Sequence, residues 1–146
     1  MGDCMIKLNK NMSLVEYIKW SQEQDTESFV KNELKNIMSN TAYQSILKDM
    51  KLYNIIDLFT CGYCYWYAYL LQIKYHGEIW YLPVDNHFIY KQNNKYYDIT
   101  GDITNYVNNL PDNQKAVSWE HYKKLDYLHT DNLYKYCINK ECDVYE

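Results

Sequence analysis

The stretch TCGYCYWYAYLLQIKYHG, residues 60–77, contains a strongly apolar helical pattern. Gly62 interrupts the pattern that leads into it, and the residues from Tyr65 to Ile73 are almost all aromatic or aliphatic. A helix that is apolar on most sides is normally buried within a protein. We therefore predict a central buried helix with Cys64 at or near its N-terminus.

Three further helices are predicted before this stretch. Ser13 and Glu16 form the capping-box pattern that opens a short amphipathic helix. Apolar residues at helical spacing predict a second helix over 29–38 and a third that is capped by Thr41 and continues to Phe59. The N-terminal half is thus expected to be helical.

After residue 77 the pattern changes to that of short strands, which are predicted over 79–84, 87–91 and 95–100. Asn93 and Asn94 are typical of a two-residue hairpin turn, and Pro83 is expected at an edge or at the end of the first strand. A further helix is predicted over 118–125, followed by a cysteine-containing tail. We predict an α+β fold with the N-terminal helices packed on a short antiparallel sheet.

The composition is that of one packed domain, which we expect to span residues 1–146. Apolar residues make up 47% of the chain and aromatic residues 17%, which argues against disorder. The first ten residues lack the apolar run of a signal peptide, and no stretch approaches the roughly 20 apolar residues that span a bilayer. We expect a cytoplasmic protein without a membrane association.

The charge pattern argues against nucleic-acid binding. All 15 basic residues are lysines, and the net charge is −4. The chain therefore lacks both the bidentate arginine fork that favours phosphate and the basic excess that holds a polyanion. The sequence gives no indication of a cofactor or of the oligomeric state, so a protein substrate or protein target is the expected partner.

The cysteines are expected to be reduced thiols, because their number, five, is odd and no secretory signal is apparent. Among them, Cys64 has the position in which a thiol becomes a good nucleophile. A helix N-terminus presents unsatisfied backbone N–H groups and the positive end of the helix dipole, and both favour a thiolate.

His87 and Asp98 lie on the two strands of the predicted hairpin. If Asn93 and Asn94 are the loop residues, the pairing of the strands makes His87 and Asp98 diagonal neighbours on one face. Such neighbours lie about 7–8 Å apart at the backbone, within reach of an imidazole–carboxylate hydrogen bond. A three-residue loop would shift the register by one and place them on opposite faces.

The segment from Cys61 to Tyr65 resembles the nucleophile segment of papain-like peptidases, Cys-Gly-Ser/Ala-Cys-Trp/Tyr, and departs from it only at Tyr63. The order of a cysteine that starts a helix, then a histidine and an aspartate on consecutive strands, resembles the papain-like and transglutaminase-like superfamily. The sequences HFIY and YYDITG resemble the corresponding strands of small phage and bacterial papain-fold proteins. The resemblance covers residues 61–104, less than a third of the chain.

This resemblance implies a catalytic triad with Cys64 as nucleophile, His87 as base and Asp98 as the residue that orients it. The implied activity is acyl transfer from a protein amide through a Cys64 thioester, as in a peptidase, a deamidase or a transglutaminase. Two departures matter. Only one strand separates the cysteine from the histidine, which excludes a two-lobed papain, and Leu58 replaces the glutamine that donates to the oxyanion.

Other interpretations remain open at this stage. Two cysteine pairs, Cys61 with Cys64 and Cys137 with Cys142, could instead bind a structural zinc ion. His76 and His121 compete with His87 as the base, although His76 suits a helix end. The chain could also be a non-catalytic, phage- or bacteria-encoded inhibitor that binds a host protein through its tyrosine-rich surface.

Overall fold

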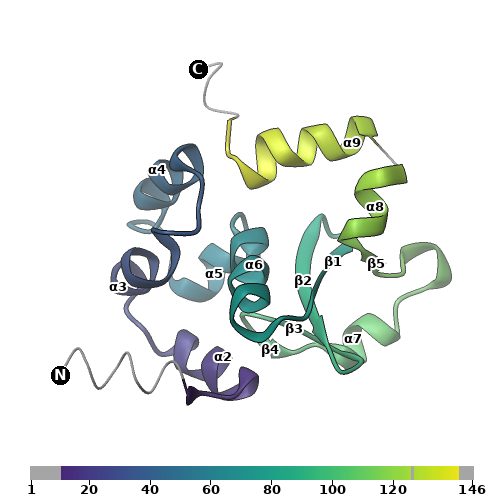
Figure 1. The fold of residues 1–146 in the computed structure, drawn as a ribbon, viewed down its shortest axis with the longest axis horizontal. Coiled ribbons are helices and arrows are strands. Elements are labelled where there is room, and N and C mark those ends of the chain that lie inside the picture. The colour runs from purple at the N-terminus through teal and green to yellow at the C-terminus, as the bar shows by residue number, and fades with distance from the viewer. Residues whose placement is uncertain (1–10, 126, 142–146) are drawn as a thin grey trace.

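The computed structural model describes residues 11–125 and 127–141 and has one antiparallel sheet surrounded by helices (Figure 1). The five strands are ordered β4-β3-β2-β1-β5. Helix α6 (Cys64–Tyr75) packs against β2 (His87–Gln92), and most helices of the N-terminal half lie on the other side of α6 from the sheet, whereas the first of them also contacts β4 (Figure 1). The predicted α+β class is confirmed. None of the described helices has both the length and the apolar character needed to cross a bilayer.

The first helix begins as its sequence pattern predicts. In α2 (Leu14–Gln22), the Ser13 hydroxyl accepts a hydrogen bond from the Glu16 N–H at 3.2 Å, and the Glu16 carboxylate accepts one from the Ser13 N–H at 3.0 Å. The second helical segment begins three residues earlier than predicted, with α3 (Thr26–Phe29) and a π-helix (Val30–Leu34). The reason is that the Asp25 side chain caps it.

The predicted single helix from Thr41 to Phe59 is wrong, because the structure divides it into α4 (Asn40–Asp49) and α5 (Ile55–Thr60). Ser39, and not Thr41, caps α4. Asn54 accepts a hydrogen bond from the N–H of Asp57 at 2.8 Å and so starts a new helix. Both halves carry apolar residues at helical spacing, so periodicity alone could not reveal the break.

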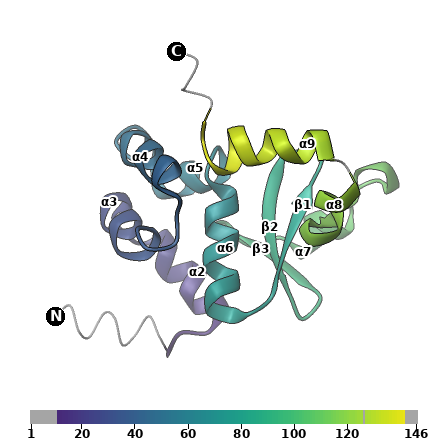
Figure 2. The same ribbon diagram turned by 45° about the horizontal axis from the view of Figure 1, so that its top comes forward.

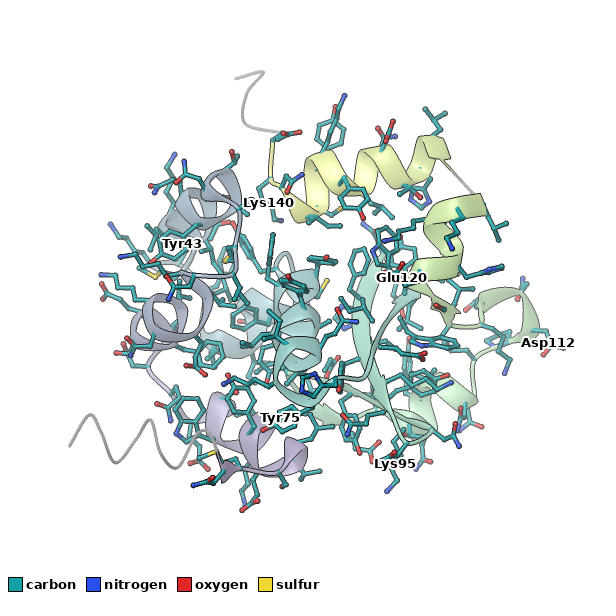
Figure 3. All side chains as sticks on the ribbon, in the orientation of Figure 1. Tyr43, Tyr75, Lys95, Asp112, Glu120 and Lys140 are labelled. Atoms are coloured by element: carbon teal, nitrogen blue, oxygen red, sulfur yellow. The ribbon has the colours of Figure 1, made fainter. Side chains whose placement is uncertain are left out.

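Helix α6 (Cys64–Tyr75) is the predicted central helix, and Cys64 is its first residue. Its buried side chains include Trp66, Tyr67 and Leu71. The helix ends at His76, which adopts the left-handed conformation with φ 63°. Figure 3 shows the side chains that fill the space between α6 and the sheet.

The sheet consists of β1 (Glu78–Leu82), β2 (His87–Gln92), β3 (Lys95–Asp98), β4 (Gly101–Asp102) and β5 (Val117–Ser118). Gln92 pairs with Lys95 across the hairpin, and Asn93 and Asn94 have φ values of 54° and 62°. This is a two-residue turn of the type that matches strand twist. The predicted register is confirmed, and β1 ends before Pro83 as expected.

The part of the predicted C-terminal tail that the structure describes, up to residue 141, is largely helical. Helix α7 (Thr104–Asn108) and a short 3₁₀ turn (Asp112–Gln114) precede α8 (Trp119–Leu125), which confirms the helix predicted over 118–125. Helix α9 (Tyr127–Asn132) and a π-helix (Leu133–Ile138) follow. This segment lies across the N-terminal end of α6 (Figure 2), where the indole N–H of Trp66 donates to the carbonyl of Ile138 at 2.8 Å.

Candidate active site

Cys64 lies where helix α6 meets strand β2. Its side chain is half-buried, and the backbone N–H of Phe88 donates to its sulfur at 3.4 Å. Phe88 is 1% exposed and packs edge-on against Trp119, with ring centroids 4.9 Å apart, so the core fixes this amide. The sulfur therefore lies at the N-terminus of α6 with a fixed backbone amide directed at it.

His87 and Asp98 form the hydrogen bond that the hairpin register predicts. His87 Nε2 lies 3.0 Å from Asp98 Oδ2, and the two side chains are only 14% and 11% exposed. Because Nε2 is engaged by the carboxylate, Nδ1 is the ring nitrogen left for the thiol. The Cys64 side chain also interacts with the His87 ring, so the structure brings together the three residues that the sequence analysis selected.

Thr100 holds the Asp98 carboxylate from its other side. Its backbone N–H donates to Oδ1 at 2.8 Å, and its hydroxyl donates to the same oxygen. Burial opposes ionisation, but the hydrogen bonds from His87 and Thr100 outweigh it and lower the pKa of Asp98. The sequence analysis missed Thr100, although an aspartate followed two residues later by threonine is typical of an Asx turn.

His87 is an imidazolium at neutral pH in this environment. Burial acts to lower the pKa of His87, but the hydrogen bond to Asp98 and the interaction with the Cys64 side chain raise it from 6.5 to about 10. The Cys64 sulfur is therefore one of the groups that stabilise the charged ring.

This raised pKa predicts how stability depends on pH. A folded-state pKa above the unfolded value of 6.5 gives stability that is fully present below pH 6.5 and lost as pH rises through about 10. Hydrogen bonds to charged groups contribute about 1.5–3 kcal/mol each. We therefore expect wild type to exceed His87→Gln in unfolding free energy by about that amount at pH 6, and by clearly less at pH 10.5. Urea unfolding of both proteins at both pH values measures this, and a difference that stayed constant would contradict it.

A cleft of about 310 Å³ opens beside Cys64, and Asn86 lies on its wall. The buried Tyr81 hydroxyl donates to Asn86 Oδ1 at 2.5 Å, which fixes the orientation of the amide. Asn86 Nδ2 then donates to Cys137 Sγ at 3.6 Å, a weak acceptor. The Asn86 backbone is left-handed, with φ 50°. No sequence motif indicates this residue apart from its place directly before His87.

The competing histidines lie elsewhere. His76 is exposed at the opposite end of α6, about 18 Å from Cys64 for a helix of 12 residues. His121 is exposed on α8. His87 is therefore the histidine of this site.

A structural zinc site does not form among the described residues. Cys61, Cys64 and Cys137 are free thiols that line one cleft, yet the described part of the chain contains no group of three or more side chains able to hold a metal ion. Cys142, the fourth ligand of the zinc interpretation, lies outside the described residues.

Comparison with known proteins identifies a family that this chain matches. A family described as Phage YunG-like protein matches residues 30–137, which is more than half of the chain and includes Cys64, His87 and Asp98. No curated protein and no solved structure matches the sequence.

Proposed function

Since this chain belongs to the family of phage YunG-like proteins, and its site lies inside the region that defines the family, we propose that it is a cysteine-dependent acyl-transfer enzyme with a papain-like or transglutaminase-like core. The proposed reaction starts from the amide of a protein substrate. Its products depend on the acceptor, since water gives hydrolysis or deamidation and an amine gives cross-linking.

One observation carries the proposal. Cys64, the first residue of a buried helix, helps to raise the pKa of His87, and Nε2 of the same ring lies 3.0 Å from Asp98 Oδ2. This is the order of nucleophile, base and orienting acid that activates a thiol in acyl-transfer enzymes. A structural role for the cysteine would need neither partner.

The steps follow from these positions. The Cys64 sulfur attacks the substrate carbonyl, and the carbon–nitrogen bond breaks as the His87 imidazolium gives its Nδ1 proton to the departing amine. The acyl group then remains on Cys64 as a thioester. Water or an amine attacks this thioester while His87 takes up the proton of the attacking group, and Asp98 keeps the ring oriented throughout.

Two donors are proposed for the oxyanion that forms during the attack. The backbone N–H of Cys64 lies in the first turn of α6, where no carbonyl of the helix can accept from it. Asn86 Nδ2 donates only weakly, to a thiol, and lines the same cleft. In this proposal Asn86 takes the oxyanion-donor role of the glutamine that papain-like enzymes have at the position of Leu58.

Acylation by p-nitrophenyl acetate tests this proposal without knowledge of the natural substrate. The sulfur forms a thioester with the acetyl group, and p-nitrophenolate leaves. We expect a burst of p-nitrophenolate that approaches one equivalent, with the acetyl group located on Cys64 by peptide mass spectrometry. Equal labelling of the more exposed Cys61 and of Cys137, or no burst at all, would contradict the proposal.

A further inference from the structure

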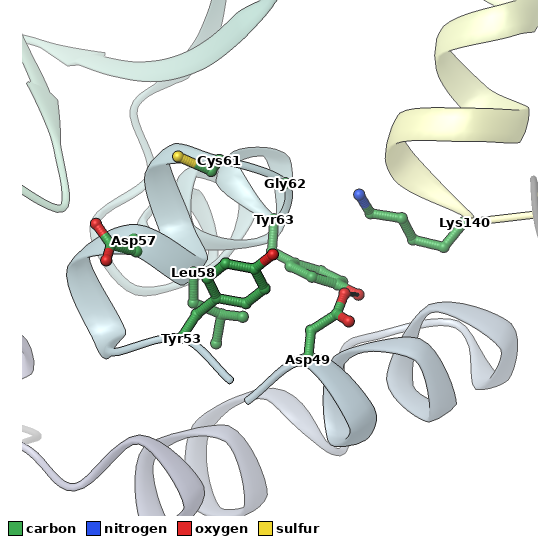
Figure 4. Close-up of a pocket in the computed structure, with 8 residues that line it drawn as sticks. All are labelled: Asp49, Tyr53, Asp57, Leu58, Cys61, Gly62, Tyr63 and Lys140. Carbon is green, nitrogen blue, oxygen red and sulfur yellow. Dashed lines mark hydrogen bonds between the residues drawn. The ribbon is translucent and has the colours of Figure 1, made fainter. Parts of the chain in front are cut away.

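Lys140 places a positive charge beside the cleft at Cys64. It lines this cleft of about 310 Å³ and also a neighbouring pocket of about 130 Å³, where Figure 4 shows its side chain extending toward the segment that contains Gly62 and Tyr63. Its Nζ lies 4.4 Å from the centroid of the Tyr63 ring. It also lies 3.3 Å from the point that a Cβ at Gly62 would occupy, so the glycine leaves room for it.

The ammonium group is held in place. Tyr63 is 2% exposed, and its hydroxyl donates to Asp49 at 2.6 Å and lies 2.6 Å from the hydroxyl of Ser45. The ring beneath the ammonium is therefore fixed. Lys140 itself has a left-handed backbone with φ 57°, a conformation that costs a lysine on the order of 1–3 kcal/mol and that clusters at functional sites.

The charge of Lys140 has no carboxylate partner in the part of the chain that the structure describes. Asp49 and Asp57 both line the neighbouring pocket; Asp49 accepts from Tyr63, and neither carboxylate forms an ion pair with Lys140. Asp85, the acidic residue on the cleft wall, accepts from the Tyr106 hydroxyl at 2.7 Å. Among the described residues this half-buried lysine is paired with an aromatic ring and with no carboxylate, so its ammonium group can still attract an anion from outside.

From this arrangement, and resting on the proposed function, we infer that Lys140 binds a carboxylate of the substrate. The enzyme then prefers amides that carry a carboxylate close to the reacting carbonyl. A glutamate or aspartate side chain and a free chain terminus both offer this group, and the test distinguishes them.

The test uses two pairs of bromoacetyl labels, which alkylate a thiol through a new carbon–sulfur bond with loss of bromide. N-bromoacetyl-alanine and its amide differ only in a terminal carboxylate. The α-amides of N-bromoacetyl-glutamate and N-bromoacetyl-glutamine differ only in a side-chain carboxylate. The rate of alkylation at Cys64 is measured by mass spectrometry for each label, in wild type and in Lys140→Met.

For each pair of labels, the ratio compares the alkylation rate of the charged label with that of the neutral one. For the pair that carries the carboxylate recognised by Lys140, we expect this ratio to fall about three- to tenfold in Lys140→Met. We expect the ratio to remain near the wild-type value in Lys140→Arg. Lys135→Met removes an equal charge from an exposed position of the same segment and is expected to leave both ratios unchanged. Unchanged ratios for both pairs in Lys140→Met, with Cys64 still reactive toward the neutral labels, would overturn this inference alone. If the neutral labels react no faster at Cys64 than in unfolded protein, the proposed function fails as well.

Discussion

Replacing His87 with alanine is expected to slow the acetylation of Cys64 by p-nitrophenyl acetate about 10²- to 10⁴-fold at pH 7, the usual contribution of a positioned acid–base group. The His87 ring interacts with the Cys64 side chain, whereas His76 and His121 are exposed elsewhere. Cys64→Ala is expected to abolish both the burst and the adduct. Stopped-flow detection of p-nitrophenolate measures the rate and the burst, and peptide mass spectrometry detects the adduct.

Asp98→Asn tests the orienting role of the carboxylate without a change of shape, because an amide keeps the shape of the carboxylate but not its charge. We expect it to retain the fold and to lose much of the activity. Urea unfolding separates a damaged fold from damaged chemistry. If Cys64→Ala were as effective as wild type in a biological assay of the protein, the binding-protein alternative would replace the enzyme.

The hairpin shows why part of the site could be predicted from sequence. Asn93 and Asn94 both adopt positive φ, which selects a two-residue turn, and that turn alone determines the register of the two strands. His87 and Asp98 therefore meet through interactions that lie within a dozen residues of chain. The start of α6 at Cys64 is equally local, since Gly62 and the apolar run mark it.

Other parts of the structure depend on distant contacts that a single sequence does not display. At the break between α4 and α5, the last residue of α4, Asp49, accepts a hydrogen bond from Tyr63, 14 residues later. The C-terminal helical segment is joined to α6 by the bond between Trp66 and Ile138, which are 72 residues apart. Lys140 reaches the site only through this long-range packing, so the sequence analysis could not select it.

Asn86 is the residue whose loss should cost the most after the triad itself. Removal of one oxyanion donor typically lowers kcat about 10²- to 10³-fold, and we expect this range for Asn86→Ala in p-nitrophenyl acetate turnover, with KM nearly unchanged. The reason is that its amide is fixed by Tyr81 and, within residues 11–125 and 127–141, donates only to a thiol, so it can bind the oxyanion without losing a strong partner there.

Three variants distinguish this role from a structural one. Asn86→Gly relieves the left-handed backbone but removes the donor, so it is expected to be as slow as Asn86→Ala while unfolding at least as late in urea. Tyr81→Phe leaves the donor but frees its orientation, and should have a smaller effect on kcat. Asn94→Ala makes the same change at another left-handed asparagine, outside the site, and should leave kcat unchanged. If Asn86→Gly kept the wild-type kcat, the oxyanion donor would have to be sought elsewhere in the cleft, because a residue that binds the transition state cannot be removed without slowing its formation.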